Sequence, residues 1–290
     1  MKFPEKHPMV MILIGICGIS FSSIFVKYSQ APSAVTAAWR LLWTVLLTSP
    51  MALLRRETRR EIAGMGRKLL LLSALSGLCL ALHFAAWFES LAHTSVASST
   101  TIVCTDVIWV CLGYCLFLKG KLSRKALLAI GVTLCGSVCI AWSDSAGGGL
   151  YGDLLALAAA VAVAVYTLLG RVVRSRVSTT AYTWVVYSTC AASLLVLCLL
   201  RQEPLTGWGP SAPLVGLLLA LFSTVLGHSI FSWCLKYFSP AFVSASKLCE
   251  PVVAAVLAAF LFGEMPTAMQ LFGAALILGG VLYYARVEQK

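Results

Sequence analysis

A few ionisable side chains interrupt long apolar stretches of this sequence, and they are its candidates for binding chemistry. Asp106 lies near the middle of one stretch, Glu250 lies near the middle of another with Lys247 three residues before it, and Arg40 lies in a third. A charge at the centre of a bilayer costs at least about 2.5–3.5 kcal/mol, so such residues normally face a cavity or a partner. A cavity that holds both acids and bases would suit a zwitterionic solute.

Each of these residues also has a structural interpretation. Lys247 and Glu250 are spaced i,i+3 and can form a neutral pair on one helix. Arg40 can tether helices or extend toward the membrane interface. Asp106 has no opposite charge within one turn of its own helix, so we expect it to be protonated, paired across helices or in contact with water.

Two histidines and two tryptophans complete the candidate site. His83 and His228 occupy nearly equivalent places in the two halves of the chain, and Trp87 follows His83 by four residues. A lone histidine in a helix is usually a hydrogen-bonded packing residue, but two at matching places beside aromatic rings indicate a cavity wall. The predicted substrate-binding residues are His83, Trp87, Asp106, Trp109, His228, Glu250, Lys247 and Arg40.

The sequence contains none of the motifs G-x-S-x-G, H-E-x-x-H or the P-loop. Cys111/Cys115 and Cys135/Cys139 are spaced i,i+4, which can place two thiols on one helix face for a soft metal. No histidine or acid lies at matching spacing, so small apolar packing residues are the favoured interpretation. We therefore expect no enzyme, no cofactor and no bound metal. A structural or receptor-like membrane protein that transports nothing is a separate alternative.

Composition indicates the class of protein. Apolar residues make up 60% of the 290 residues and charged residues 11%, with a mean hydropathy of +0.90, whereas globular chains carry about 25% charged residues. About 20 apolar residues in a helix span a hydrocarbon core of about 30 Å, so the sequence predicts an all-α polytopic membrane protein with ten transmembrane helices. The predicted spans are 8–28, 33–54, 69–92, 95–118, 124–142, 150–170, 179–200, 211–236, 241–263 and 267–285.

The distribution of basic residues predicts the orientation. Of the 22 Lys and Arg residues, eighteen lie on one side of the ten-helix arrangement; the remaining four are Lys27 and Arg201 on the other side, and Arg40 and Lys247 within spans. This positive-inside pattern places both termini in the cytoplasm and accounts for the net charge of +11 without a nucleic-acid partner. We expect a multi-pass protein of the cytoplasmic (inner) membrane.

The two halves of the chain match at a constant offset. Asp106 corresponds to Glu250 and Gly136 to Gly280, both 144 residues apart (250 − 106 and 280 − 136). The predicted repeats are 1–146 and 150–290, with five helices each. Because five is odd, the second repeat enters the membrane from the opposite side, and such inverted repeats place a substrate site near the midplane where they meet.

Two segments carry a resemblance to a known family. Residues 235–285 contain two apolar runs joined by a short turn, with Glu250-Pro251 inside the first run and several glycines in the second. Residues 83–97 read HFAAWFESLAHTSVA, which is similar to an HF..WF.SL..TSVA pattern. Both resemble the ten-helix EamA-type branch of the drug/metabolite transporter superfamily.

The first repeat departs from the pattern of that family. Val107 stands where a proline is usual late in the fourth helix, and Gly120 stands where a glutamate is usual at its end. The second repeat keeps Pro251 and Glu264 at the matching places. Asp106, just before the absent proline, is therefore assigned by its position rather than by analogy.

The resemblance implies a secondary transporter that moves a small polar or amphipathic metabolite by alternating access, with export of an amino acid or a related compound. An importer or exchanger of a nucleoside-like or other small solute is the alternative. The expected partners are a small-molecule substrate and the lipid bilayer, and we expect a monomer. A proton is the candidate coupling ion, because burial favours the neutral form of a carboxyl group. Asp106 is the predicted carrier, since Lys247 favours the charged form of Glu250.

Overall fold

The computed structural model of the chain describes residues 5, 7–94, 96–142, 149–262 and 267–288, and within these residues it contains helices and no strands. The turn at 263–266, with Glu264, and most of the loop at 143–149 lie outside the described residues. The helices are α2 (Pro8–Ser20), α3 (Ser22–Val26), α4 (Ser33–Ser49), the π-helical η1 (Pro50–Leu54), α5 (Arg56–Ala63), α6 (Arg67–His93), α7 (Val96–Val103), α8 (Asp106–Phe117), α9 (Arg124–Trp142), α10 (Leu150–Arg174), α11 (Thr179–Leu200), α12 (Ser211–Leu218), the π-helical η2 (Leu219–His228), α13 (Ser229–Cys234), α14 (Pro240–Lys247), α15 (Glu250–Phe262) and α16 (Ala268–Glu288).

Every predicted span is largely helical, but the number of membrane-crossing helices is not confirmed as ten. Within the described part of the chain, eight helical stretches are both long and apolar enough to cross a bilayer. The two predicted spans outside this set are α9 and the α14–α15 pair. Neither α14 nor α15 crosses alone, because the helix is interrupted at Leu248–Cys249 and the two pieces have 8 and 13 residues.

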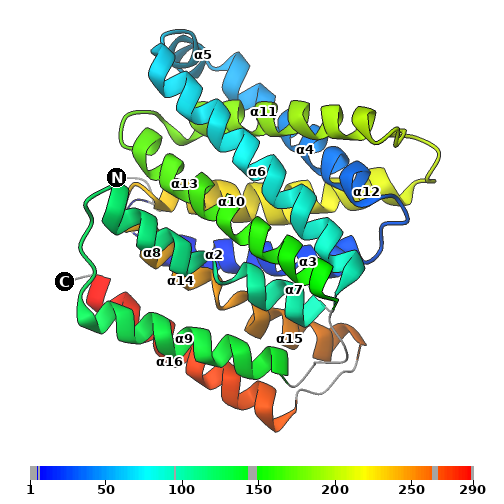
Figure 1. The fold of residues 1–290 in the computed structure, drawn as a ribbon. Helices are drawn as coiled ribbons and strands as arrows, with labels where there is room; N and C mark the ends of the chain where they lie inside the picture. Colours follow the sequence, from blue (N-terminus) through cyan, green and yellow to red (C-terminus); the bar gives the residue numbers. More distant parts are fainter. Residues whose placement is uncertain (1–4, 6, 95, 143–148, 263–266, 289–290) are drawn as a thin grey trace.

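The helices pair in a pattern that relates the two halves of the chain (Figure 1). The second helix of the first half, α4, packs against its counterpart α11; likewise α8 packs against α14, and α9 against α16. The first and third helices exchange partners, because α2 packs against η2 and α13 while α6 packs against α10. An approximate twofold relation between the halves produces this arrangement, and the interface between them passes through the centre of the molecule.

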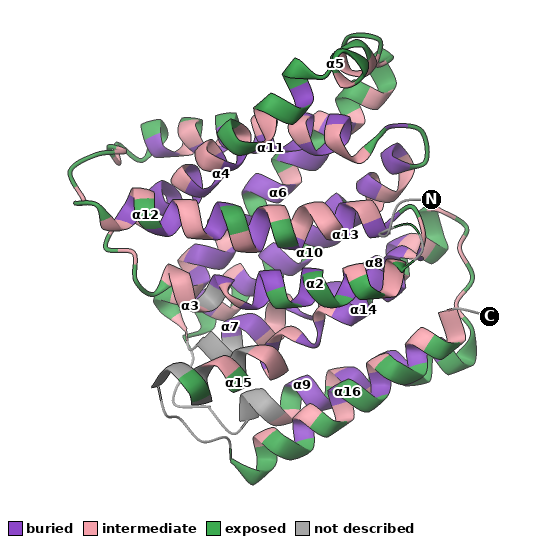
Figure 2. Cartoon of the chain, turned by 180° about the vertical axis from the view of Figure 1, so that it is seen from behind, coloured by how far each residue is buried: buried purple, intermediate pink, exposed green. Residues whose placement is uncertain are grey.

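Most of the large apolar side chains exposed to the surroundings lie on the outer faces of the helices, where Figure 2 shows exposed residues along α9, α16 and α2. Examples are Leu128 on α9, Leu282 on α16 and Leu13 on α2, each more than half exposed. Such a surface suits contact with lipid, since soluble monomers rarely expose large apolar patches.

Inside the molecule, the buried apolar side chains form two clusters. One is built mainly on α4, α6, α10 and α11, and the other mainly on α2, α13, α14 and α16 together with parts of α8 and α9. The first cluster includes Phe84 and Tyr187, and the second includes Phe242 and Tyr284. The polar residues described next lie where these clusters meet.

Glycine allows a close helix approach beside the second cluster. A Cβ atom placed on Gly136 of α9 would lie 2.6 Å from the carbonyl oxygen of Gly273 on α16. Only a residue without a side chain fits at that distance, as is common where membrane helices cross. This contact holds α9 and α16 together as a pair at one edge of the molecule (Figure 1).

Candidate functional site

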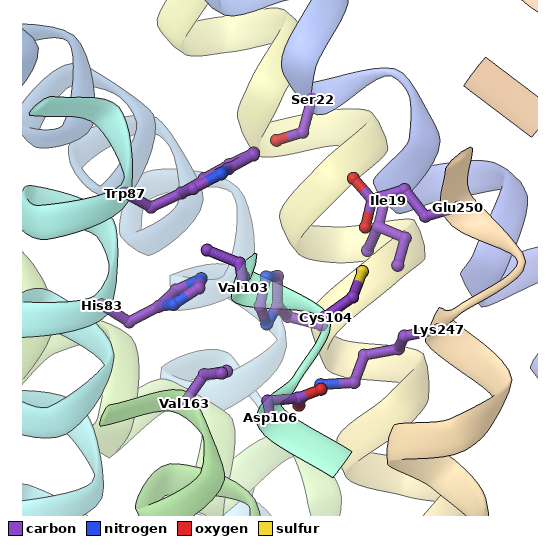
Figure 3. A pocket seen from close by; sticks show the side chains of 11 residues that line it. Ile19, Ser22, His83, Trp87, Val103, Cys104, Asp106, Val163, Lys247 and Glu250 are labelled. Carbon is purple, nitrogen blue, oxygen red and sulfur yellow. The ribbon is translucent and has the colours of Figure 1, made fainter. Parts of the chain in front are cut away.

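A cavity lies between the two clusters, and the space between atoms there, open solvent included, is about 490 Å³. It draws residues from six of the predicted spans, including helices of both halves of the chain. The lining residues are Ile19, Ser22, His83, Trp87, Val103, Cys104, Asp106, Val163, His228, Lys247 and Glu250 (Figure 3). Six of the eight predicted site residues are therefore brought together: His83, Trp87, Asp106, His228, Lys247 and Glu250.

Asp106 is buried, with 2% of its surface exposed, and it pairs with a cation from the other half of the chain. Lys247 Nζ on α14 donates to Asp106 Oδ2, and Ser244 Oγ donates to the same oxygen at 2.6 Å. Of the three states expected for Asp106, the structure shows the pair across helices. The charge of Asp106 is thus compensated, and α8 is joined to α14.

Glu250 has no such partner. Among the described residues, no cation lies within 4.0 Å of its carboxylate and none of the hydrogen bonds involves it. Figure 3 shows Lys247 extending toward Asp106, whereas Glu250 extends toward Ile19 and Ser22. The neutral Lys247–Glu250 pair considered from the sequence is not formed, because the lysine turns to the neighbouring helix.

Matching interruptions position the two acids. The helix that carries Glu250 breaks at Leu248–Cys249, and Glu250 is the first residue of α15. Pro251 has no N–H for the carbonyl of Lys247, so the chain there closes tighter bonds, from Leu248 N to Ala245 O at 3.1 Å and from Cys249 N to Ser246 O at 3.2 Å.

The first half breaks at the equivalent place without a proline. The α7–α8 helix is interrupted at Cys104–Thr105, and Asp106 is the first residue of α8. Thr105 N and Thr105 Oγ1 both donate to the carbonyl of Ile102, at 3.0 and 2.6 Å. A threonine hydroxyl that competes for helix carbonyls therefore produces the break, although Val107 stands where the family usually has a proline.

Aromatic rings form another wall of the cavity. His83 and Trp87 on α6 stack with ring centroids 6.0 Å apart and an angle of 11° between their planes. His83 Nδ1 lies 3.0 Å from the carbonyl oxygen of Ala159, so Nδ1 carries the proton and donates it to that oxygen. The ring of His228, the last residue of η2, lies 6.4 Å from that of His83. Trp87 Nε1 is a buried donor without a partner among the described residues.

Arg40 and Trp109 do not line the cavity. The Arg40 side chain is fully buried, and it donates from Nε to Thr224 Oγ1 at 2.8 Å and from Nη1 to Ser22 Oγ at 3.3 Å. Its guanidinium lies 4.0 Å from the centroid of the Phe84 ring. Arg40 on α4 thus links this helix to η2 and α3, as in the tethering role considered from the sequence. Ser22 lies between Arg40 and the cavity.

A second, smaller cavity, with about 280 Å³ of space between atoms when open solvent is included, adjoins the first, because Val163, His228 and Lys247 line both. Its other residues include Tyr166 and Ser232, whose hydroxyls lie 2.8 Å apart. The Asp106–Lys247 pair therefore lies beside the place where the two cavities meet.

Several lining residues were not predicted. Ser22 belongs to a run of small residues in the first span, and that run was the only signal for it. Cys104 and Val163 resemble the apolar residues around them in sequence, so composition does not distinguish them. Among the described residues there is no cluster of three or more His, Cys, Asp or Glu that could hold a metal ion.

An all-helical chain with an apolar exterior and a charged central cavity has the features of a membrane transporter. The profile of the EamA-like transporter family matches residues 7–142 and again residues 150–286. The chain belongs to this family of the drug/metabolite transporter superfamily, and it has the family's two-repeat architecture.

Two individual proteins are similar to the chain, one in sequence and one in fold. "Uncharacterized transporter sll1319" from Synechocystis sp. (strain ATCC 27184 / PCC 6803 / Kazusa) is 25% identical, over 94% of this chain and 86% of that protein. A solved crystal structure with 19% sequence identity superposes with a TM-score of 0.78 over 97% of this chain and 96% of that chain, and this likeness concerns the fold. Family and relative point to a multi-pass membrane transporter rather than an enzyme.

Proposed function

We propose that this protein is a secondary transporter that exports an amino acid or a related small metabolite by alternating access. The observation that carries the proposal is the cavity between the two halves, which combines an unpaired acceptor, Glu250, with an unpaired donor, Trp87 Nε1. An ammonium group would pair with the carboxylate, while a carboxylate would accept from the indole N–H. The surrounding His83 ring and Val103 would contact an apolar side chain of the solute.

Alternating access requires that the two halves open in turn on either side of a central site. The interrupted helices fit this requirement, because breaks before Asp106 and Glu250 provide places where half-helices can change direction. The Asp106–Lys247 pair beside the junction of the two cavities would be rearranged when the solute passes from one to the other.

Counterflow in proteoliposomes tests the proposal. We expect vesicles loaded with an unlabelled mixture of amino acids to accumulate radiolabelled amino acids from outside, and protein-free vesicles to show no accumulation. Repeating the assay with nucleosides tests the alternative solute class. If nucleosides show protein-dependent counterflow and amino acids do not, the substrate is nucleoside-like and the proposed amino acid is wrong. If neither class shows counterflow, transport of both classes is contradicted.

The proposed location is the cytoplasmic membrane with both termini in the cytoplasm. Cysteines introduced one at a time into the parent chain, at the exposed positions Arg59 on α5 and Thr206 after α11, test this topology. In intact cells a membrane-impermeant maleimide should label Thr206→Cys but not Arg59→Cys, and permeabilisation should expose both. The parent chain is the control, since its cysteines lie within the predicted spans. Labelling of Arg59→Cys in intact cells would reverse the orientation.

A further inference from the structure

We propose that Glu250 is the group at which a proton binds and is released during transport, and that Asp106 is a fixed carboxylate held by Lys247. This inference rests on the proposed transport function and assigns its coupling site. It differs from the expectation drawn from the sequence, which placed the proton on Asp106.

The first support is the difference between the two carboxylates. Asp106 accepts from both Lys247 Nζ and Ser244 Oγ. Glu250 accepts from no described residue, although it lines the same cavity. Each acid begins a helix segment, so the favourable effect of a helix N-terminus on negative charge applies to both and does not distinguish them. The position of the Lys247 side chain does distinguish them.

The second support is the surroundings of Glu250. From α2 and α3 it is faced by Ile19 and Ser22, neither of which carries a charge. Glu250 is only partly buried, but even partial removal of an unpaired carboxylate from water is unfavourable, and binding a proton removes the charge that causes this cost. The other charged or titratable side chains that line the cavity or lie behind it are Lys247 on α14, Asp106 on α8, Cys104 before α8, His83 on α6, His228 on η2 and Arg40 on α4.

Counting charge shows what a proton at Glu250 would do. With neutral histidines, the lining holds two carboxylates and one ammonium group, so its net charge is −1 with Glu250 ionised (−2 + 1) and 0 with Glu250 protonated. A proton and the ammonium group of a solute would then compete for one carboxylate. Exclusive binding of either at a shared site gives exchange of solute against protons when the protein changes its access only with that site occupied.

Infrared difference spectroscopy of the purified protein tests the site with the proton itself as the probe. Between about pH 9 and about pH 6, a range in which carboxyl groups with ordinary pKa values of about 4 stay ionised, we expect a carboxylic acid C=O band that appears on acidification. Glu250→Gln should remove the band, whereas the Asp106→Asn/Lys247→Met double variant should keep it. A band that persists in Glu250→Gln, or its absence from the parent protein, would overturn the proposal.

Counterflow of the amino acid mixture under an imposed pH gradient provides the second measurement. The flux of the parent protein should change with the gradient, and whatever flux Glu250→Gln retains should not. If Glu250→Gln is not monodisperse, Glu250→Asp replaces it, because a shorter carboxylate should shift the band and its midpoint pH. A pH response that survives in Glu250→Gln but is lost in His83→Gln or His228→Gln would move the proton site to a histidine. If the parent protein shows no counterflow, the proposed function fails while the infrared result still decides the role of Glu250.

Discussion

Lys247→Met is expected to destabilise the protein by about 3–5 kcal/mol, because it leaves the buried carboxylate of Asp106 without its cation. The side chains of Lys247 and Asp106 are 16% and 3% exposed, so water compensates little for the loss. Ser244 remains as a donor to Asp106, but one hydroxyl does not replace an ammonium group. Thermal unfolding of the purified protein in detergent measures the effect.

The double variant Lys247→Met/Asp106→Asn is the matched control for this prediction. It removes both charges together, so the cost of a buried unpaired charge disappears and most of the lost stability should return. Additive losses in the double variant, or single variants as stable as the parent, would show that the pair does not hold α8 to α14.

Arg40→Ala should destabilise by a similar amount, about 3–5 kcal/mol, since it removes one of the largest fully buried side chains and leaves a void. It also removes the hydrogen bonds to Thr224 and Ser22 and the contact with the Phe84 ring. Thermal unfolding again provides the measurement.

Two further substitutions separate the parts of the Arg40 effect. Arg40→Met keeps most of the volume and removes the donors, so we expect a smaller loss, on the order of 1–3 kcal/mol. Arg40→Lys keeps the charge but not the planar guanidinium, and it should not restore full stability. If Arg40→Ala unfolds at the parental temperature while transport is lost, Arg40 contacts the solute rather than tethering helices.

The positions of the helices could be predicted from the sequence, because the physical requirement for them is local. A helix crosses the bilayer when about 20 consecutive residues are apolar, and this can be read directly from composition along the chain. The predicted spans 33–54 and 179–200 match α4–η1 and α11 at both ends. The helix interruptions at Phe21 and at Cys104–Thr105 could not be read in this way, since they depend on the hydrogen bonds of one or two residues, such as those from Thr105 N and Thr105 Oγ1 to the carbonyl of Ile102.

The candidate site was only partly predictable for a related reason. The 144-residue offset brought Asp106 and Glu250 together as equivalents, and the structure places both on one cavity directly after equivalent helix breaks. Spacing along one helix, however, says which partners are near in sequence and not which lie across an interface. Lys247 is three residues from Glu250 and yet pairs with Asp106, 141 residues away.

The central claim is that the solute passes through this cavity, and one substitution tests it most directly. Val163 on α10 lines both cavities and is 3% exposed, whereas Val161 on the same helix is 38% exposed on its outer face. Counterflow of labelled amino acids should be abolished in Val163→Trp, whose indole fills the path, and retained in Val161→Trp. Flux at the parental rate in a folded Val163→Trp protein would contradict the account.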